Sequence, residues 1–521
     1  MSAVDAKPTY LSVGRAPDLV MRNERLRYRF FEMLPGLLAW STLFGTVIFS
    51  AILPLWVAMF IILFDVYWLL KTIFLSLHLV AAYRKMKENL AVDWLNRLEL
   101  LDSANSSTSW KDIRHLVIVP FYNEPLEVIQ LSLSAIAASH YPLDRFIVVL
   151  ASEERSGEHG KRVCAAVQSA FEKTFFRFIV TVHPAGIVGE IAGKGSNEAW
   201  AGKRAKEYID TLGIAYERVV VSVLDSDTRV PPGYFARLTH AYLTAAQPLH
   251  TSFQPIPVFS NNFWDAPFFS RVVASSATFW HMMKQEQEER LTTFSSHSMS
   301  FWAIVRMGFW QPNVVSEDSR VFWQALFVFD GNYRVAPLHY PVSMDACIAS
   351  TALQTVKNQY KQQRRWGWGV ENIPYMLLGF IKNKNIPLRK KLYYTGIQLE
   401  AFWSWSTNAL MLFMLGWLPL WLGGEQFNRS VLSYNLPLIT RTLMTLALIG
   451  MFVSAAISML LLPPRPARYR KGKTLLMALQ WLILPFSILL LGALPGLEAQ
   501  TRLMFGKYLG FWVTEKARKT L

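Results

Sequence analysis

Long apolar stretches lie near both ends of the chain. Residues 34–53 and 55–80 follow each other near the start, and three more stretches lie near the end at 402–422, 438–462 and 474–494. An α-helix needs about 20 apolar residues to cross the hydrocarbon core of a bilayer, and each stretch is long enough. The pattern predicts membrane-spanning helices on both sides of a long middle segment, two before it and three after it.

The middle segment, residues 113–350, has the pattern of a soluble α/β domain. Short runs rich in β-branched residues alternate there with helix-length segments such as 126–139. The strand-like runs are 116–120, 146–150, 178–182 and 219–224. Strands that alternate with helices predict a mostly parallel sheet with helices on both faces. We therefore expect an α/β domain inserted between α-helical membrane segments.

Further segments connect these parts. Residues 81–101 alternate basic and apolar positions at helical spacing, which predicts an amphipathic helix on the membrane surface. Residues 102–110, rich in serine and asparagine, indicate a linker. Aromatic and basic residues intermix between 351 and 392 and predict interfacial helices. The predicted units are 1–112 with the basic N-terminus and the first two spans, 113–350, 351–392, 393–497 with the last three spans, and the basic tail 498–521.

The chain carries 53 lysines and arginines against 37 acidic residues, a net charge of +16. Such a charge suits a nucleic-acid-binding protein until the positions are considered. The cations gather beside the apolar stretches, for example at 389–391 and 465–473, as the positive-inside rule predicts for cytoplasmic loops. We therefore expect the lipid bilayer and no nucleic acid as a partner. The two cysteines, Cys164 and Cys347, exclude a disulfide framework and fit a reducing compartment.

These patterns predict a multi-pass protein of a bacterial plasma membrane, with its N-terminus and its middle segment in the cytoplasm. The side on which the tail lies stays open. Three crossings from the cytoplasm would place residues 498–521 outside, whereas the cations of this tail favour the inside. Pro485 or the turn Leu494-Pro495-Gly496 could instead make the last stretch re-entrant.

Ionisable residues interrupt the apolar stretches. Asp65 and Lys71 lie within the second one, and Glu400 and Arg441 lie close to the later ones. An ionisable group inside a bilayer is costly, so it lines a polar cavity or pairs with a partner. These residues could therefore line a polar passage. Alternatively, Asp65 hydrogen-bonds between helices and Lys71 extends its amine toward the bilayer surface.

Two aspartates follow the most strand-like run of the chain. Val-Val-Val-Ser-Val-Leu at 219–224 leads directly into Asp225-Ser226-Asp227. Ligand sites in open α/β sheets lie at the carboxyl ends of strands, and a pair of aspartates there can hold a divalent cation together with substrate phosphates. A solvated strand end with a turn explains the same pair by itself.

Polar groups also follow the first two strands. Tyr122, Asn123 and Glu124 come after the first strand, and Glu153 comes at the end of the second. Such groups could contact a nucleotide at the same edge of the sheet, although a helix cap explains Asn123 almost as well.

The segment Gly193-Lys194-Gly195-Ser196-Asn197 combines a flexible backbone, a cation and an amide, which suit phosphate or sugar hydroxyls. No Walker pattern of glycine, lysine and serine is present in the sequence, so ATP hydrolysis is poorly supported.

Two later motifs add a carboxylate and an arginine. In Ser316-Glu317-Asp318-Ser319 a carboxylate could take a proton from a substrate hydroxyl, while such a pair alone is more typical of a helix N-terminus. Residues 362–366, Gln-Gln-Arg-Arg-Trp, join an arginine suited to diphosphate with a tryptophan suited to stacking on a sugar. A basic, aromatic interfacial helix would look the same.

Taken in order, these motifs resemble those of one family. The strand-end Tyr-Asn-Glu, Gly-Lys-Gly-Ser-Asn, Asp-Ser-Asp, Ser-Glu-Asp and Gln-x-x-Arg-Trp look like the motif series of membrane-integral family 2 glycosyltransferases, which include cellulose, chitin and hyaluronan synthases. Each motif alone is weak, but five in this order between apolar stretches are specific. The resemblance covers the middle and interfacial segments and implies a GT-A-type nucleotide-sugar-binding domain.

The resemblance also implies roles for the matched residues. Asp225 and Asp227 would hold Mg²⁺ or Mn²⁺ against the donor diphosphate. Asp318 would be the catalytic base, with Glu317 beside it in the catalytic motif. The residues implied in nucleotide-sugar binding are Tyr122, Glu124, Glu153, Lys194, Asn197, Asp225 and Arg365. Those implied in acceptor binding are Gln362, Trp366, His297 and Ser298, where His297 replaces the usual glycine of the family.

The implied reaction is an inverting transfer of a sugar from a nucleotide diphosphate donor, with a UDP-sugar as the first expectation. We expect processive synthesis of a glycan, with or without an export partner, and keep single transfer to a lipid carrier as the alternative. A non-catalytic scaffold or transporter is a different class of function. It would have lost an acid at Asp225, Asp227 or Asp318, and all of these are present.

Overall fold

A mixed α/β sheet forms the centre of the molecule. The computed structural model describes residues 9–103 and 109–513, and within them seven strands pair in the order β3-β2-β1-β4-β6-β5-β7. The strands are β1 Arg114–Pro120, β2 Phe146–Glu153, β3 Arg177–His183, β4 Val219–Val223, β5 Thr251–Val258, β6 Ser298–Ser300 and β7 Arg334–Ser343. β3, β2, β1 and β4 are parallel, as are β5 and β7, and β6 runs antiparallel between β4 and β5. The strands predicted from the four β-branched runs are thus confirmed.

Alternate residues of β1 enter different cores. Leu116 and Ile118 pack on one face of the sheet, and Val117 and Val119 pack on the other. Successive side chains of a strand point to opposite faces, so the continuous apolar run is buried on both. Helices α6 Lys194–Thr211, α9 Phe301–Met307, α10 Glu317–Val328 and α12 Asn372–Lys382 cover the first face. Helices α4 Leu126–Ala137, α5 Gly157–Phe171 and α7 Tyr234–Thr244 cover the second.

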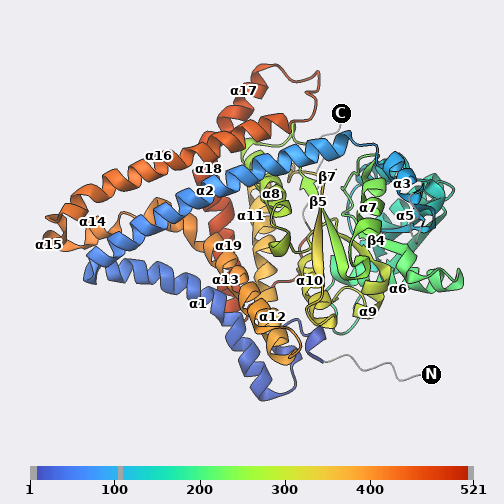
Figure 1. Cartoon of the computed structure of the whole chain (residues 1–521), viewed down its shortest axis with the longest axis horizontal. Helices are drawn as coiled ribbons and strands as arrows, with labels where there is room; N and C mark the ends of the chain where they lie inside the picture. Colours follow the sequence, from blue (N-terminus) through green and yellow to red (C-terminus); the bar gives the residue numbers. More distant parts are fainter. Residues whose placement is uncertain (1–8, 104–108, 514–521) are drawn as a thin grey trace.

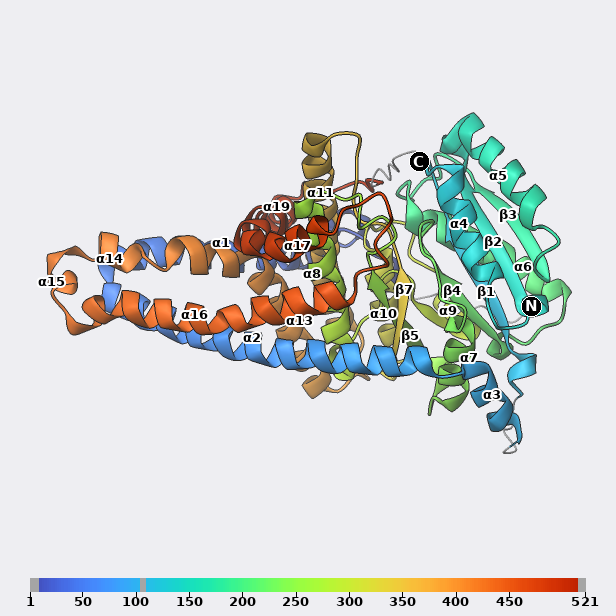
Figure 2. The same cartoon turned by 90° about the horizontal axis from the view of Figure 1, so that it is seen from above.

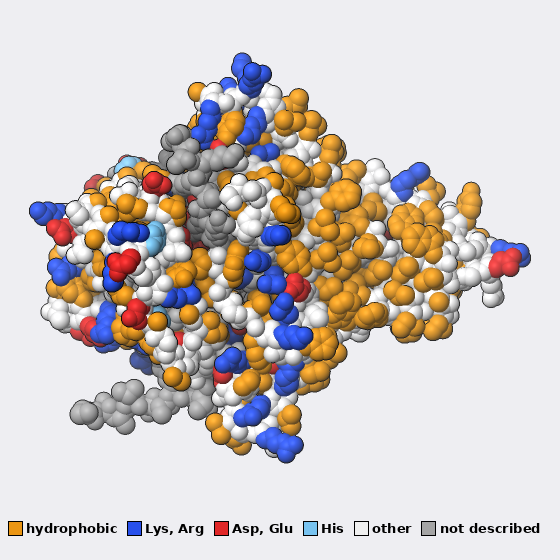
Figure 3. All heavy atoms as spheres, turned by 180° about the vertical axis from the view of Figure 1, so that it is seen from behind, with side chains coloured by type: hydrophobic (Ala, Val, Ile, Leu, Met, Phe, Trp, Pro, Cys, Tyr) orange, Lys and Arg blue, Asp and Glu red, His pale blue; other side chains and the backbone are white. Residues whose placement is uncertain are grey.

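An apolar bundle projects from one side of this domain (Figures 1 and 2). Among the described residues, four helical runs are long and apolar enough to cross a membrane. They are α1 Arg22–Ile52, α2 Pro54–Ala91, α16 Val431–Leu460 and the run Gly472–Met504. Hydrophobic side chains cover the projecting surface, and basic residues gather where it meets the domain (Figure 3). These features are consistent with a membrane protein.

The apolar stretch 402–422 does not form one uninterrupted α-helix. Its first part belongs to α13, Leu388–Leu410, which continues into a π-helical turn at Met411–Leu415 and then into the short helix α14, Leu418–Leu422. The break divides the apolar residues between different helices. The other four predicted spans correspond to helical runs that are long and apolar enough to cross a membrane, and the span near 402–422 stays a prediction. A further short helix, α15 Gly424–Asn428, leads to α16.

The last apolar run takes a course that differs from a simple crossing. It comprises α17 Gly472–Leu479, α18 Leu484–Ile488 and α19 Leu494–Met504, joined by 3-10 and π turns, and it lies across α2 and α16 (Figures 1 and 2). Near its start, Lys473 Nζ donates to the carbonyl of Trp264 at 2.5 Å. At its end, Arg29 Nη1 donates to the carbonyl of Leu503 at 2.8 Å. Both ends thus lie at the end of the bundle that meets the α/β domain, the course that the re-entrant alternative predicted.

The amphipathic stretch 81–101 is also divided. Its first half prolongs α2 to Ala91, and its second half belongs to α3, Trp94–Ser103, after a break at Val92 in extended conformation. Leu98 of α3 is fully buried in the core of the α/β domain. The apolar side of this segment therefore covers the domain, and the prediction of one helix on the membrane surface is wrong.

The interfacial segment contains α11, Ala352–Gly367, a 3-10 turn at Trp368–Glu371 and then α12. α11 packs against α19 and close to α8, Phe268–Gln285. Part of the expected linker and the tail beyond Val513, with Lys516, Arg518 and Lys519, lie outside the described residues. The division into units at 112, 350, 392 and 497 stays a prediction.

Candidate active site

The carboxyl ends of β1, β2 and β4 open on a cavity of about 1550 Å³. Parallel strands end at the same edge of a sheet, which is why motifs far apart in the sequence meet there. The residues of the sequence motifs that line the cavity are Tyr122, Glu124, Glu153, Lys194, Asn197, Asp225, Asp227, Glu317, Asp318, Gln362, Arg365 and Trp366. The structure thus brings together all the predicted site residues except His297 and Ser298.

Lys194 lies at the centre of the acidic groups. Its ammonium is 2.7 Å from Asp225 Oδ1 and donates to both oxygens of Asp318, at 2.9 and 2.8 Å. Glu198 Oε1 and Glu317 Oε1 lie 3.4 and 3.8 Å from the same nitrogen. Burial lowers the pKa of Lys194, but the surrounding carboxylates outweigh this effect and raise it well above its ordinary value. The lysine is therefore charged and links Asp225 after β4 to Asp318 at the start of α10.

The two glutamates beside Lys194, Glu317 and Glu198, have raised pKa values. Burial, reinforced by the charge of Asp318, raises the pKa of Glu317 to about 8. Burial also raises the pKa of Glu198 well above its ordinary value. Both side chains are almost completely buried, and Glu317 favours its neutral form at neutral pH. Glu198 was not predicted, although it follows Lys194 by one helical turn, and that spacing places the two side chains on one face of α6.

The acidic groups differ in how well they suit a divalent cation. Glu198, Glu317 and Asp318 place oxygen atoms within 4.8 Å of one another, but the ammonium of Lys194 already lies among them. Asp225 and Asp227 offer the better fit, because they follow one strand, line the cavity and present carboxylate oxygens, the ligands that Mg²⁺ prefers.

Neighbouring groups hold both of these aspartates. Ser295 Oγ donates to Asp225 Oδ2 at 2.8 Å, and the backbone N–H of Asp345 donates to Asp227 Oδ2 at 3.1 Å. Carboxylates fixed by such bonds are oriented before any ligand arrives. The donor set of Asp225 and Asp227 therefore fits a divalent cation.

The residues predicted near the nucleotide also hold the loops in place. Glu124 accepts the backbone N–H groups of Tyr122 and Asn123 at 2.8 and 3.0 Å and the hydroxyl of Ser226 at 3.1 Å. It thereby ties the turn after β1 to the turn after β4. Asn197 Nδ2 donates to the carbonyl of Ala151 on β2 at 2.7 Å. Both residues fix the edge of the cavity through bonds that require no ligand.

An aromatic and cationic group lies next to these loops. The guanidinium of Arg155 is 4.1 Å from the ring centroid of Tyr122, and its Nη2 donates to Glu153 at 3.0 Å. A charged group over an aromatic face is favourable. Tyr122 and Glu153 therefore form a rigid surface that a nucleotide base or a ribose can contact.

Arg365 and Trp366 of α11 also line the cavity. Arg365 Nε is buried and has no hydrogen-bond partner among the described residues. The ring of Phe511 lies 5.0 Å from the guanidinium, and a Cβ at Gly193 would come within 2.5 Å of the same ring. The chain after α19 thus passes between Arg365 and the glycine-rich loop. Sequence patterns missed Phe511, because the segment 498–521 was predicted only as a basic tail and no motif marks this ring.

His297 and Ser298 do not line the cavity, so their prediction as acceptor-binding residues is corrected. Ser298 is buried in β6 and its hydroxyl lies 2.7 Å from that of Ser222. His297 is 1% exposed. Its Nε2 accepts the indole N–H of Trp310 at 3.2 Å, so in the neutral ring the proton is on Nδ1.

This proton faces the carbonyl of Phe294 at 2.9 Å. Asp318 Oδ1 lies 3.6 Å from the same nitrogen, so His297 stands directly behind the carboxylate that the cavity exposes. Burial lowers the pKa of His297 and keeps the ring neutral, although Asp318 acts in the opposite sense. The neutral imidazole therefore packs against Asp318 on the side of the protein interior.

The cavity continues from the acidic groups around Lys194 toward the apolar helices. Asp65 and Lys71 of α2 and Glu400 of α13 line this part. The ammonium of Lys71 is 2.5 Å from Glu400 Oε1, and the hydroxyl of Tyr67 donates to the same oxygen at 3.1 Å. Arg441 is exposed and is not part of the lining, so the expectation that it lines a passage is wrong.

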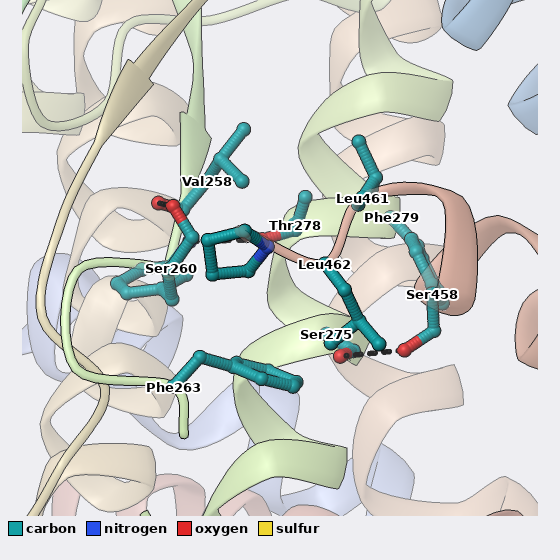
Figure 4. A pocket seen from close by; sticks show the side chains of 11 residues that line it. Val258, Ser260, Phe263, Ser275, Thr278, Phe279, Ser458, Leu461 and Leu462 are labelled. Carbon is teal, nitrogen blue, oxygen red and sulfur yellow. Dashed lines mark hydrogen bonds between the residues drawn. The ribbon is translucent and has the colours of Figure 1, made fainter. Parts of the chain in front are cut away.

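A second pocket is too small to bind a sugar. It lies between the end of β5, α8 and the end of α16, where Ser275 and Ser458 form a hydrogen bond at 3.4 Å (Figure 4). Its volume of about 20 Å³ is space for about one water molecule. We assign no substrate to it.

The chain is similar to known glycosyltransferases. A family model described as "Glycosyl transferase family group 2" matches residues 220–494, which is more than half of the 521-residue chain. No curated protein sequence matches the chain significantly.

Among solved structures, mannosyltransferase PcManGT from Pyrobaculum calidifontis, in complex with GDP-Man and Mn²⁺, has 16% identity and a TM-score of 0.39, over 76% of this chain and 98% of that one. TarS 1–349 from S. aureus, in complex with UDP-GlcNAc, has 13% identity and a TM-score of 0.35, over 66% and 90% of the two chains. The family model decides the assignment: the chain belongs to glycosyl transferase family group 2 and is a glycosyltransferase.

Proposed function

We propose that the protein transfers a sugar from a nucleotide diphosphate donor to a growing glycan, with inversion at the anomeric carbon. One observation carries the proposal. The cavity that contains Asp318 also contains Asp225, Asp227 and Arg365, and Lys194 links Asp318 to Asp225. A base, a cation site and a diphosphate-binding arginine are the groups that a single displacement at a nucleotide-sugar requires.

Each residue has a chemical task in this reaction. Asp318 accepts the proton of the acceptor hydroxyl as its oxygen attacks the anomeric carbon, and the ammonium of Lys194 keeps this carboxylate in position. Arg365 stabilises the negative charge that grows on the leaving diphosphate, since its Nε is buried and has no partner among the described residues. The bond to the leaving oxygen breaks as the new glycosidic bond forms, so no enzyme nucleophile takes part.

We further propose that Asp225 and Asp227 hold Mg²⁺ or Mn²⁺. When bound, such an ion supplies positive charge for the leaving diphosphate. Tyr122 and Glu153 are proposed to line the nucleotide side, with UDP-sugars as the first donors to test. Gln362 and Trp366 are proposed to contact the acceptor, because both line the cavity on α11.

Processive synthesis is the form of the reaction that we favour. Its support is the continuation of the cavity to Asp65 and Glu400, which gives a growing glycan a polar path among the apolar helices. The proposed setting is a bacterial plasma membrane with the α/β domain in the cytoplasm, with or without an export partner. Single transfer to a lipid carrier is the second candidate, and its support is that Leu70 and Phe74 line the same cavity while remaining 62% and 47% exposed on the apolar surface.

The test is release of nucleotide diphosphate by the full chain in membranes. A panel of UDP-, GDP- and dTDP-sugars is supplied with Mg²⁺ or Mn²⁺, and wild type is compared with Asp318→Asn. We expect metal-dependent release from one donor and a loss of at least about 100-fold in the variant. Equal release by both proteins would remove Asp318 from its role, and no release from any donor would contradict the proposed activity. Product length then separates a polysaccharide from a single sugar on an extracted lipid.

The matched control is Glu158→Gln. Glu158 is an exposed carboxylate on α5 whose partner is Lys161. This variant removes a charge from the same domain without touching the cavity, so we expect it to release nucleotide diphosphate at the wild-type rate.

A further inference from the structure

Glu371 lies between the segment that carries Arg365 and the segment that carries Asp318. It ends the 3-10 turn Trp368–Glu371 that follows α11, six residues after Arg365, and its side chain is 7% exposed. It is not among the residues that line the cavity. Its carboxylate points instead at the segment that carries Asp318.

The bonds of this carboxylate are directed at the start of α10. Glu371 Oε1 accepts the backbone N–H groups of Val315 and Ser316 at 2.9 and 2.8 Å, and the hydroxyl of Ser316 at 2.7 Å. Ser316 is the N-cap of α10, and its side chain makes no capping bond to the helix. A negative charge at this position is favourable, because the N-terminus of a helix carries partial positive charge. Glu371 thus holds the N-terminus of the helix from outside.

The other carboxylate oxygen is held on its own side. Glu371 Oε2 accepts the indole N–H of Trp368 at 2.8 Å. Trp368 is almost fully buried and packs with Val315 in one apolar cluster. The carboxylate therefore cannot rotate without losing bonds on both sides, and it fixes the distance between the turn after α11 and the turn before α10.

We propose that Glu371 is a positioning residue for Asp318, coupling the place of this base to the place of Arg365. Asp318 follows Ser316 by two residues, so a shift of the Ser316 backbone moves the base relative to the acceptor. Arg365 is on α11, which leads directly into the 3-10 turn that ends at Glu371, so one carboxylate sets the spacing between the base and the arginine that faces the leaving group. Misplacement of a reacting group by about 1 Å can cost about 100-fold in rate.

The proposal rests on the proposed function through the role of Asp318, and two measurements keep them apart. The first uses hydrogen–deuterium exchange of the full chain in nanodiscs and needs no donor. In Glu371→Ala, the amides of Val315 and Ser316 should exchange at least about 10-fold faster than in wild type, while the amides of β1 and β4 keep their protection. Unchanged exchange at these two amides would overturn the proposal whether or not a donor is known.

The second measurement is transfer with the donor that the panel identifies. Glu371→Ala should lower kcat by about 100-fold and leave the KM for donor within about threefold. Faster exchange with an unchanged kcat would show that the bonds exist and do not position the base, which overturns the proposal. A wild-type protein that is inactive with every donor would contradict the proposed function, while the exchange experiment would still decide the contact.

Two conservative substitutions, alone and combined, distinguish a positioning role of Glu371 from a general loss of structure. In Glu371→Gln the carbonyl oxygen still accepts from Val315 and Ser316, but the new amide N–H₂ faces the indole N–H of Trp368, donor against donor. Trp368→Phe removes that conflict. We expect the double variant to recover the kcat of Trp368→Phe alone, above that of Glu371→Gln. A double variant slower than both single ones would indicate loss of structure and count against the proposal.

Discussion

Replacing Glu317 with glutamine tests the electrostatics of the site most directly. Glu317 is 2% exposed, and its Oε2 has no hydrogen-bond partner among the described residues. Burial, reinforced by Asp318, raises its pKa from 4.5 to about 8. Below that pH the folded protein keeps the neutral acid, which glutamine resembles in shape and charge.

The expected effect on stability follows from the two pKa values. In the unfolded chain Glu317 loses its proton near pH 4.5, whereas in the folded chain it keeps the proton up to about pH 8. An acid with a raised pKa favours the folded state fully at low pH, and this contribution is lost as the pH rises between these values. The loss is about 1.4 kcal/mol per pH unit, or about 5 kcal/mol over the whole interval as an upper limit. Glutamine has no proton to lose, so the variant should be less sensitive to pH.

The measurement is thermal unfolding of the detergent-purified protein, followed by tryptophan fluorescence at several pH values from 5 to 8. The apparent midpoint of wild type should fall more steeply with pH than that of Glu317→Gln. Glu158→Gln serves as the control and should keep the wild-type slope, because its carboxylate is 77% exposed. Parallel slopes for wild type and Glu317→Gln would show that Glu317 is charged in the folded protein and would refute the reasoning.

The same variant separates the adjacent acids in catalysis. Because Glu317 is neutral near pH 7, its replacement by glutamine should leave at least about a tenth of the transfer rate, whereas Asp318→Asn should lose nearly all of it. If Glu317→Gln were inactive in transfer while Asp318→Asn kept its activity, Glu317 and not Asp318 would be the catalytic base.

Further predictions concern the surroundings of the same cluster. Lys194→Met should destabilise the fold by about 1–3 kcal/mol, because it leaves the partly exposed carboxylates of Asp225 and Asp318 without the ammonium that they share, and the loss of unfolding midpoint should be smaller at pH 5.5 than at pH 7.5. Gly193→Ala should lower activity through its clash with the ring of Phe511, and Phe511→Ala should relieve the effect in the double variant, as a double-mutant cycle of activity would measure. His297→Ala should cost about 1–3 kcal/mol in unfolding experiments, because it leaves the buried indole N–H of Trp310 without an acceptor.

The order of the motifs was enough to predict most of the site. Apolar runs that end in polar residues fix where parallel strands stop, and parallel strands stop at one edge of the sheet. Strand ends alone therefore predicted that Asp225, Glu153 and Tyr122 lie together. Lys194 and Arg365 came from local motifs whose chemistry suits phosphate.

Other parts of the site depend on contacts that no local pattern encodes. Glu371 acts on Ser316 across 55 positions of the chain, and Phe511, near the C-terminal end of the chain, contacts Gly193. His297 stands where the family usually has a glycine, and its ring lies in the interior, where Nε2 accepts from Trp310. Side-chain direction, unlike strand position, is decided by packing between distant segments.

Four of the five predicted spans correspond to helical runs that are long and apolar enough to cross a membrane, but the course of two apolar stretches was not predictable. Hydropathy registers the length of an apolar stretch and says little about whether one helix carries it. The stretch 402–422 is broken by a π-helical turn at Met411–Leu415, and the last run bends across its neighbours at turns near Pro485 and Pro495. Length and composition could indicate an apolar environment but could not give the course of the chain through it.

The negative charge of the aspartates in the cavity explains why a donor diphosphate would need a bound cation in order to enter it. Near neutral pH, Glu317 is mostly protonated, so the carboxylates that face Lys194 most closely are those of Asp225 and Asp318, and Asp227 follows Asp225 by two residues. A nucleotide diphosphate brings further negative charge to a wall that is already acidic, and Coulomb repulsion across a few ångströms in a partly buried site amounts to several kcal/mol. Lys194 alone cannot offset this repulsion, since its ammonium is already shared between Asp225 and Asp318. The aspartates after β4 thus make sense as cation ligands, because an ion with two positive charges would turn a wall that repels the diphosphate into one that binds it.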